Sequence, residues 1–172
     1  KKLSEILQNA QKEFGHEIFI IADEPYRELV YDSIEVPFIP NYYNNTIVCY
    51  SFSKSLSLPG ERIGYVLVPD TATKWQYIYF AVCGAGRSLG FVCAPSLFQK
   101  LVPYCIGKTS DTSVYKKNRD ILCKALSDYG YTVAQPDGAF YLFVKALEPD
   151  ARAFCEKAKK HELLLVASDS FG

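Results

Sequence analysis

The sequence predicts an α/β fold, because segments with helical periodicity alternate with short apolar runs that are typical of buried strands. Residues 2–14 carry apolar side chains at helical spacing, and Gly15 is a typical stop signal for such a helix. The next run, residues 18–22, is continuously apolar, which is typical of a parallel-sheet strand buried on both faces. Two further apolar runs, residues 47–50 and 63–68, predict two more strands.

The rest of the chain predicts a smaller α+β unit. Residues 71–94 are rich in aromatic and small side chains, which fits either a helix or a strand. Beyond them we expect a helix that begins at Ala94-Pro95 and is ended or kinked by Pro103, an amphipathic helix over residues 112–129, a hairpin of residues 131–134 and 140–144, a helix over about 150–161, and a strand over 163–167. The break between the two units is expected within residues 69–105.

Composition excludes several classes of protein. Of the 172 residues, 49% are hydrophobic and 22% are charged, which argues against a disordered chain. Nineteen basic residues balance nineteen acidic ones, so the charge gives no reason to expect nucleic acid or an anionic membrane as a partner. We expect a cytoplasmic location, since no apolar run reaches the length of a membrane span and the N-terminal residues do not resemble a signal peptide.

The six cysteines lack the paired spacing of a zinc site, so we expect no metal and interpret them as small core residues in a reducing compartment. The sequence contains no methionine, not even at position 1. We therefore interpret Lys1 and Gly172 as cut ends of a longer gene product.

A first candidate site is Asp23-Glu24-Pro25-Tyr26. Its carboxylate follows an apolar strand, and in open α/β sheets ligands bind at the carboxyl ends of the strands. A charged group at a dry position is costly unless a cation or a hydrogen-bond donor meets it. The alternative is that Asp23 simply opens a surface turn before Pro25.

A second candidate site follows the next strand. Residues 51–64 combine small hydroxyl side chains with Lys54 and Arg62. Hydroxyls and a guanidinium suit a phosphate, and a lysine in partly apolar surroundings can attack a carbonyl to form a Schiff base. The alternative is a polar loop with an exposed lysine.

Together, the two segments contain the parts that a pyridoxal phosphate site requires: an acid, a phenol, an amine and a phosphate clamp. In this the sequence resembles the class I/II aminotransferases, which are fold-type I enzymes that use this cofactor. The family motifs D-E-x-Y, S-x-S-K and R-x-G occur here at residues 23–26, 51–54 and 62–64, in the family's order and spacing. Residues 136–144 are similar to a strand of the family's small domain, and residues 168–172 are similar to the loop before its carboxylate-binding arginine.

The resemblance implies a role for each matching residue. Lys54 would hold the cofactor as a Schiff base and then act as general acid and base. Asp23 would pair with the pyridinium N–H, and Tyr26 would hydrogen-bond the phenolic oxygen of the ring. The phosphate would be held by Ser51, Ser53 and Arg62, although Ser53 could instead only shape the loop.

The resemblance also implies that the chain is a fragment. Residues 1–70 correspond to the last part of the cofactor-binding domain, residues 71–105 to a connecting helical region at the interface, and residues 106–172 to an incomplete small domain. The family's N-terminal half and its carboxylate-binding arginine would lie outside the chain. We therefore expect the 172-residue chain to be inactive alone and the full-length protein to be a homodimeric aminotransferase, acting on an amino acid of the aspartate or aromatic kind and on a 2-oxo acid.

Other functions fit the same motifs. A β-lyase, such as a cystathionine β-lyase, or a decarboxylase would use the same cofactor for a different reaction. An aminotransferase-like domain of a transcription regulator would sense pyridoxal phosphate without turnover. The glycine-rich residues 84–90 resemble a dinucleotide-binding turn, but no acid-terminated second strand accompanies them.

Overall fold

The computed structural model describes residues 1–170. The chain forms two compact units, which divide between Ser110 and Asp111. Residues 71–105 lie within the first unit. Their proposed role as a connecting interface region stays a prediction.

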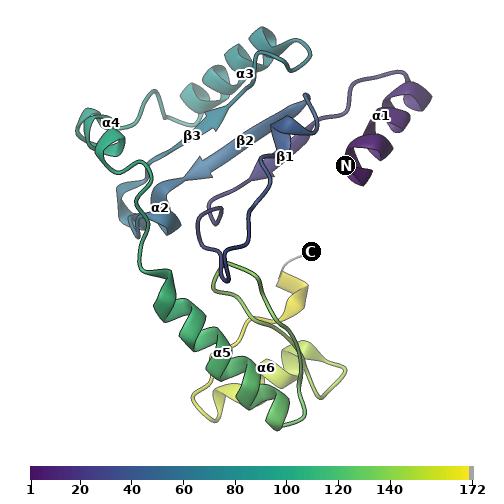
Figure 1. Ribbon diagram of the computed structural model, residues 1–172, viewed down its shortest axis with the longest axis vertical. Coiled ribbons are helices and arrows are strands. Elements are labelled where there is room, and N and C mark those ends of the chain that lie inside the picture. Colours follow the sequence, from purple (N-terminus) through teal and green to yellow (C-terminus); the bar gives the residue numbers. More distant parts are fainter. Residues whose placement is uncertain (171–172) are drawn as a thin grey trace. The chain divides into compact units, whose positions relative to one another are not determined.

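The first unit is built on a three-stranded mixed sheet (Figure 1). Strand β1 (Ile20–Asp23) pairs in parallel with β2 (Thr46–Ser51), and β3 (Gly64–Leu67) pairs antiparallel with β2. The helices of this unit are α1 (Lys2–Phe14), α2 (Phe52–Ser55), α3 (Trp75–Ser88) and α4 (Ser96–Leu101), with short 3-10 turns at Ile39–Asn41, Pro59–Glu61 and Val102–Tyr104. The predicted helix at the N-terminus and the three predicted strands are therefore confirmed, with ends that differ by one or two residues.

A polar network fixes the start of the sheet. Helix α1 ends at Gly15, whose φ of 68° suits a residue without a Cβ atom. The side-chain oxygen of Gln11 accepts hydrogen bonds from the backbone N–H of Ile18 and from the amide of Asn45. Asn45, only 6% exposed, in turn accepts a bond from the Thr73 N–H. This network joins the end of α1, the start of β2 and the segment before α3, so it sets where the strands begin.

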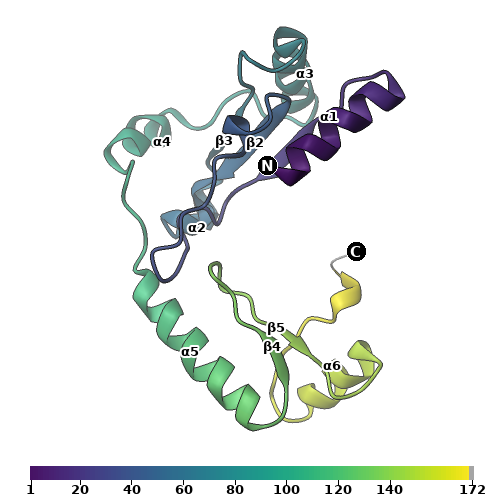
Figure 2. The same ribbon diagram turned by 45° about the vertical axis from the view of Figure 1, so that its right-hand side comes forward.

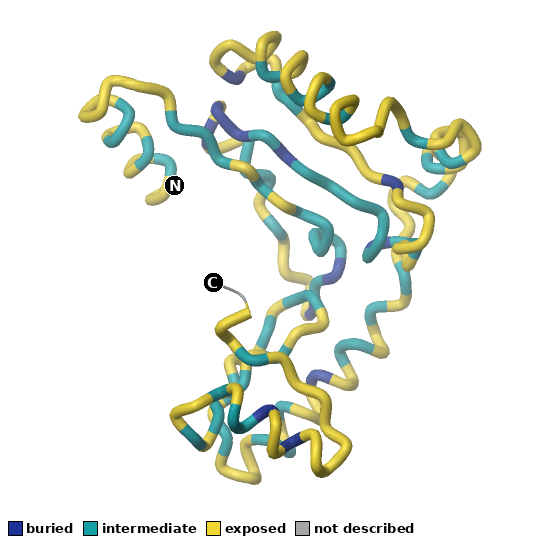
Figure 3. Tube along the Cα trace, turned by 180° about the vertical axis from the view of Figure 1, so that it is seen from behind, coloured by how far each residue is buried: buried dark blue, intermediate teal, exposed yellow. Residues whose placement is uncertain are grey.

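The expectation that β1 is buried on both faces is wrong. Burial alternates along the strand, and Ile21 is 70% exposed. The buried side chains of this unit include Val48 on β2, Ser55 on α2, and Leu29, Tyr31 and Tyr43 in the loop between β1 and β2; buried positions are dark blue in Figure 3. Within the first unit, residues 1–110, the side of β1 that carries Ile21 is exposed, so a run that is apolar in sequence has one open face there.

The ambiguous residues 71–94 contain a helix. Helix α3 includes the apolar run that could have been a strand and the first two glycines of the segment that resembles a nucleotide-binding turn, Gly84 and Gly86, whereas Gly90 follows the helix with a φ of 86°. A strand followed by a glycine turn is therefore absent from this segment, which is fully described. Large side chains of the helix, such as Tyr77 and Phe80, are exposed in the chain (Figure 3).

The described part of the second unit contains helices α5 and α6 and a hairpin, which can be followed in Figure 2. Helix α5 (Thr112–Asp128) leads to strands β4 (Thr132–Ala134) and β5 (Phe143–Lys145), and α6 (Ala151–Lys159) follows. The strands pair antiparallel, which confirms the predicted hairpin. Both helices begin at an aspartate, Asp111 and Asp150, whose carboxylates accept backbone hydrogen bonds from the first turn.

Two other expectations are wrong. Residues 163–167 form no strand, because no neighbouring strand pairs with this apolar segment among the described residues. Leu164 within the segment is 84% exposed. Cysteine burial was overestimated: all six thiols are free, but only Cys155 is buried and Cys93 is exposed. Over the described part of the chain, every helix is too short or too polar to span a lipid bilayer.

Candidate active site

The candidate site lies where β1 and β2 end. These strands are parallel, so their carboxyl ends share one edge of the sheet. Asp23 is the last residue of β1, and Ser51 is the last residue of β2. The Glu24 N–H donates to the Cys49 carbonyl at 2.9 Å, which keeps the chain after Asp23 against β2. The first predicted motif therefore begins beside the strand that carries the second.

Lys54 and Tyr26 are brought together from these two motifs. Lys54 lies on α2, a single helical turn that begins directly after β2. Its Nζ atom lies 5.8 Å from the centroid of the Tyr26 ring, within the range of a cation–π contact. An amine and a phenol that are far apart in sequence thus face the same space.

Ser51 and Ser53 form the turn that carries the lysine. Ser51 is the N-cap of α2, and its Oγ accepts a hydrogen bond from the Ser53 N–H at 3.2 Å. The two hydroxyl oxygens lie 2.7 Å apart. Two adjacent hydroxyls are hydrogen-bond donors that suit an anionic oxygen.

Arg62 directly precedes a residue that is bonded to the same turn. The Phe52 N–H, which lies between the two serines, donates to the carbonyl of Ile63 at 3.1 Å. Arg62 adopts a left-handed conformation with φ of 51°, and its guanidinium donates to the Pro59 carbonyl at 2.8 Å. The structure therefore brings the predicted phosphate ligands Ser51 and Ser53 together, whereas the Arg62 guanidinium is bonded to the Pro59 carbonyl.

Gly64 has a structural role that the motif reading did not assign. It pairs with Ser51 across β2 and β3, and a Cβ atom there would lie 2.3 Å from the Tyr50 carbonyl oxygen. Only a residue without a side chain allows β3 to approach β2 this closely. The signal was present in the sequence as the glycine of R-x-G.

Arg27, which follows the D-E-x-Y motif, was also missed. Its guanidinium contacts the Glu24 carboxylate at 2.7 Å and donates to the Val36 carbonyl at 2.7 Å. It also lies 5.4 Å from the centre of the Phe38 ring. Arg27 thus ties the far end of this long loop to the residues next to Asp23 and Tyr26.

Electrostatics at the edge of the sheet are mild. Burial, and to a smaller extent the nearby Asp23 carboxylate, raises the pKa of the Cys49 thiol. Cys49 pairs in register with Asp23, so both side chains lie on the same face of the sheet. Asp23 itself is exposed, so the dry surroundings expected for its carboxylate are not present among the described residues.

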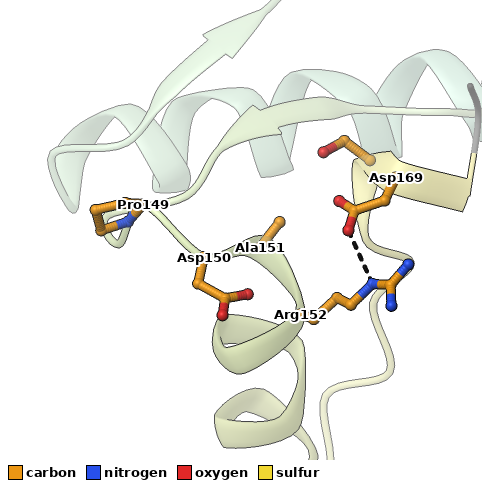
Figure 4. A pocket seen from close by; sticks show the side chains of 6 residues that line it. Pro149, Asp150, Ala151, Arg152 and Asp169 are labelled. Atoms are coloured by element: carbon orange, nitrogen blue, oxygen red, sulfur yellow. Dashed lines mark ion pairs between the residues drawn. The ribbon is translucent and has the colours of Figure 1, made fainter.

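The second unit contains a separate hollow of about 540 Å³ (Figure 4). It is lined by Pro149, Asp150, Ala151, Arg152, Ser168 and Asp169. The Arg152 guanidinium pairs with the Asp169 carboxylate at 2.8 Å, and none of the six predicted site residues lines the hollow. Residues 168–172 are the segment predicted to resemble the family loop before the carboxylate-binding arginine. Ser168–Ser170 form a 3-10 turn, and Phe171 and Gly172 lie outside the described residues.

A family model supports the motif reading. Residues 1–172 match the family described as aminotransferase class I and II, and the chain belongs to this family. The fold is accordingly part of the fold-type I aminotransferase fold, as the sequence predicted.

Individual relatives agree. The chain is 64% identical to an amino transferase from Eubacterium rectale of known structure, with a TM-score of 0.95 over 99% of this chain and 43% of that one. It is 27% identical to a putative aminotransferase of Bacillus subtilis over 99% of this chain and 44% of the relative. It is also 31% identical to a probable N-acetyl-LL-diaminopimelate aminotransferase of Bacillus subtilis, over 75% of this chain and 32% of the relative. The chain thus spans less than half the length of these relatives.

The donor set fits the cofactor that this family implies. A carboxylate, a phenol and an amine follow the ends of β1 and β2, the amine sits on a turn with two hydroxyls, and a guanidinium lies on the segment that leads into β3. These groups match a pyridine nitrogen, a phenolic oxygen, an aldehyde and a phosphate, respectively. Among residues 1–170, no cluster of histidine, cysteine and acidic side chains is suited to hold a metal ion.

Proposed function

We propose that the full-length gene product containing this chain is a pyridoxal phosphate-dependent aminotransferase that moves an amino group between an amino acid and a 2-oxo acid. The observation that carries the proposal is the position of Lys54. Lys54 lies on a single helical turn capped by Ser51, and its Nζ atom lies 5.8 Å from the centroid of the Tyr26 ring. Family membership supports the reaction class.

Each residue contributes a distinct property. Lys54 would supply the amine that holds the cofactor, and a proton carrier once that amine is released. Asp23 would keep a proton on the ring nitrogen, and Tyr26 would donate a hydrogen bond to the phenolic oxygen. The phosphate ligands would be Ser51, Ser53 and Arg62. When bound, pyridoxal phosphate supplies an electron sink for the charge that develops on the substrate carbon.

The substrate class rests on the relatives. Several of them are named aspartate or aromatic amino acid aminotransferases, including an aromatic-amino-acid aminotransferase of Thermococcus litoralis and an aspartate aminotransferase of Pyrococcus abyssi. We extend this to an aspartate-like or aromatic amino acid as the donor, a homodimeric full-length protein and a cytoplasmic location. We also propose that the 172-residue chain alone does not turn over.

Absorbance tests the lysine assignment. The full-length protein incubated with pyridoxal phosphate should show the visible band of a lysine adduct, and Lys54→Ala should lose it. Lys100→Ala, which removes an exposed lysine of α4, is the control and should keep the band. A band that survives Lys54→Ala would refute the assignment.

Product analysis tests the reaction. Amino transfer to 2-oxoglutarate by the full-length protein is the expected result. Release of carbon dioxide or of a β-substituent, with no amino transfer, would instead indicate a decarboxylase or a β-lyase. Robust transfer by the 172-residue chain alone would contradict the proposal that it is inactive.

A further inference from the structure

A cluster of three polar side chains joins the two loops of the candidate site. The Tyr50 hydroxyl lies 2.8 Å from a carboxylate oxygen of Glu28 and 2.8 Å from the hydroxyl of Ser55. Glu28 follows Tyr26 by two positions in the loop after β1, and Ser55 follows Lys54 directly on α2. The cluster therefore contacts the residues next to both groups that face each other in the site.

The proton count fixes the direction of the bonds. A phenol has one proton, and a carboxylate can only accept. Tyr50 therefore donates to Glu28, and Ser55 donates its own proton to the phenol oxygen. Each member of the cluster holds the next one in a defined orientation.

The surroundings of the cluster make it rigid. Ser55 is 2% exposed, and its carbonyl accepts a hydrogen bond from the Ser110 N–H at 2.7 Å. The Tyr50 ring stacks on Tyr65 and meets Phe52 edge-on, with both centroid distances at 5.1 Å. Burial, with the Glu28 bond as a further cause, raises the pKa of Tyr50 to about 12, so the phenol remains a donor at any working pH.

The Tyr50 side chain lies on the opposite face of β2 from Ser51. Side chains alternate along a strand, so Tyr50 projects away from the face that carries Cys49 and Ser51. Tyr50 thus has no direct access to a molecule bound by Ser51, and it can act only through the two loops. This makes it a positioning residue rather than a catalytic one.

We propose that Tyr50, with Glu28 and Ser55, sets the spacing between Lys54 and Tyr26. This inference rests on the proposed function, because the spacing matters only if Lys54 and Tyr26 serve the same bound molecule. Loss of the Tyr50 hydroxyl would free α2 from the Glu28 loop. Tyr26 would then hold the phenolic oxygen less well, and the pKa of the lysine adduct would rise.

The test is a pH titration of the visible band in the full-length protein loaded with pyridoxal phosphate. Tyr50→Phe keeps the ring and deletes the hydroxyl, and it should raise the titration midpoint by about 0.5 pH unit or more, the size expected for a weakened hydrogen bond. The matched control is Tyr65→Phe, which deletes a hydroxyl from the ring stacked on Tyr50 and should leave the midpoint unchanged.

A second variant covers the case in which Tyr50→Phe does not fold. Ser55→Ala removes the hydroxyl on the lysine side and should raise the midpoint in the same direction. An unchanged or lowered midpoint in the variant that folds, or an equal rise in Tyr65→Phe, would overturn the inference. Failure of the proposed function would give a different result, namely a visible band that persists in Lys54→Ala.

Discussion

Replacing Gly64 with alanine would place a methyl group 2.3 Å from the Tyr50 carbonyl oxygen and 3.1 Å from the Ser51 Cα atom. The first distance is roughly 1 Å short of ordinary van der Waals contact. Both neighbours are backbone atoms of β2 and cannot rotate away, so β3 would have to move. Overpacking usually costs about 1–3 kcal/mol, and this site should fall at the upper end because the rigid backbone takes the strain.

The expected result is a free energy of unfolding lower by about 2–3 kcal/mol, which in urea would move the midpoint by about 1 M. Gly84→Ala is the matched control, because a Cβ at that helical glycine meets nothing within 4 Å. That change should instead stabilise the protein by about 0.5–1 kcal/mol, since alanine favours helix more than glycine does. Equal midpoints for wild type and Gly64→Ala would refute the reasoning about close approach.

Two further predictions follow from the same strand end. Ser51→Ala removes the cap of α2 and should lower the unfolding free energy by about 1 kcal/mol, whereas Ser51→Thr, which keeps a hydroxyl, should lose less; similar losses for both in urea melts would contradict a capping role. The folded-state pKa of Tyr50 is raised from 10.0 to about 12. Its contribution to stability should therefore be complete below pH 10 and lost as the pH rises to about 12, and Tyr50→Phe should flatten that part of the stability profile. An unchanged slope in the variant would point to another group.

The parts of the candidate site that are local could be predicted as one group from the sequence. Ser51, Ser53 and Lys54 belong to one turn, and a hydroxyl before a short helix is a recognisable cap. The hairpin of the second unit was equally readable, since its turn residues lie between its two strands. In each case the interacting groups are near neighbours along the chain.

Features that depend on distant partners could not be read in the same way. The Tyr50–Glu28 bond spans 22 positions, and an alternating strand pattern does not reveal it. Residues 163–167 have a strand-like composition, but a strand also needs a neighbour to pair with, which composition does not encode. Likewise, the apolar run at 18–22 indicates a strand but not how many layers cover it.

The brevity of α2 constrains how this segment can vary in evolution or design. Because the lysine lies on one turn of helix, each added residue between Ser51 and Lys54 would rotate the lysine by about 100° around the helix axis. A single insertion there would aim the amine away from Tyr26. Shuffling or grafting of this module should therefore cut after the lysine and never between it and its cap.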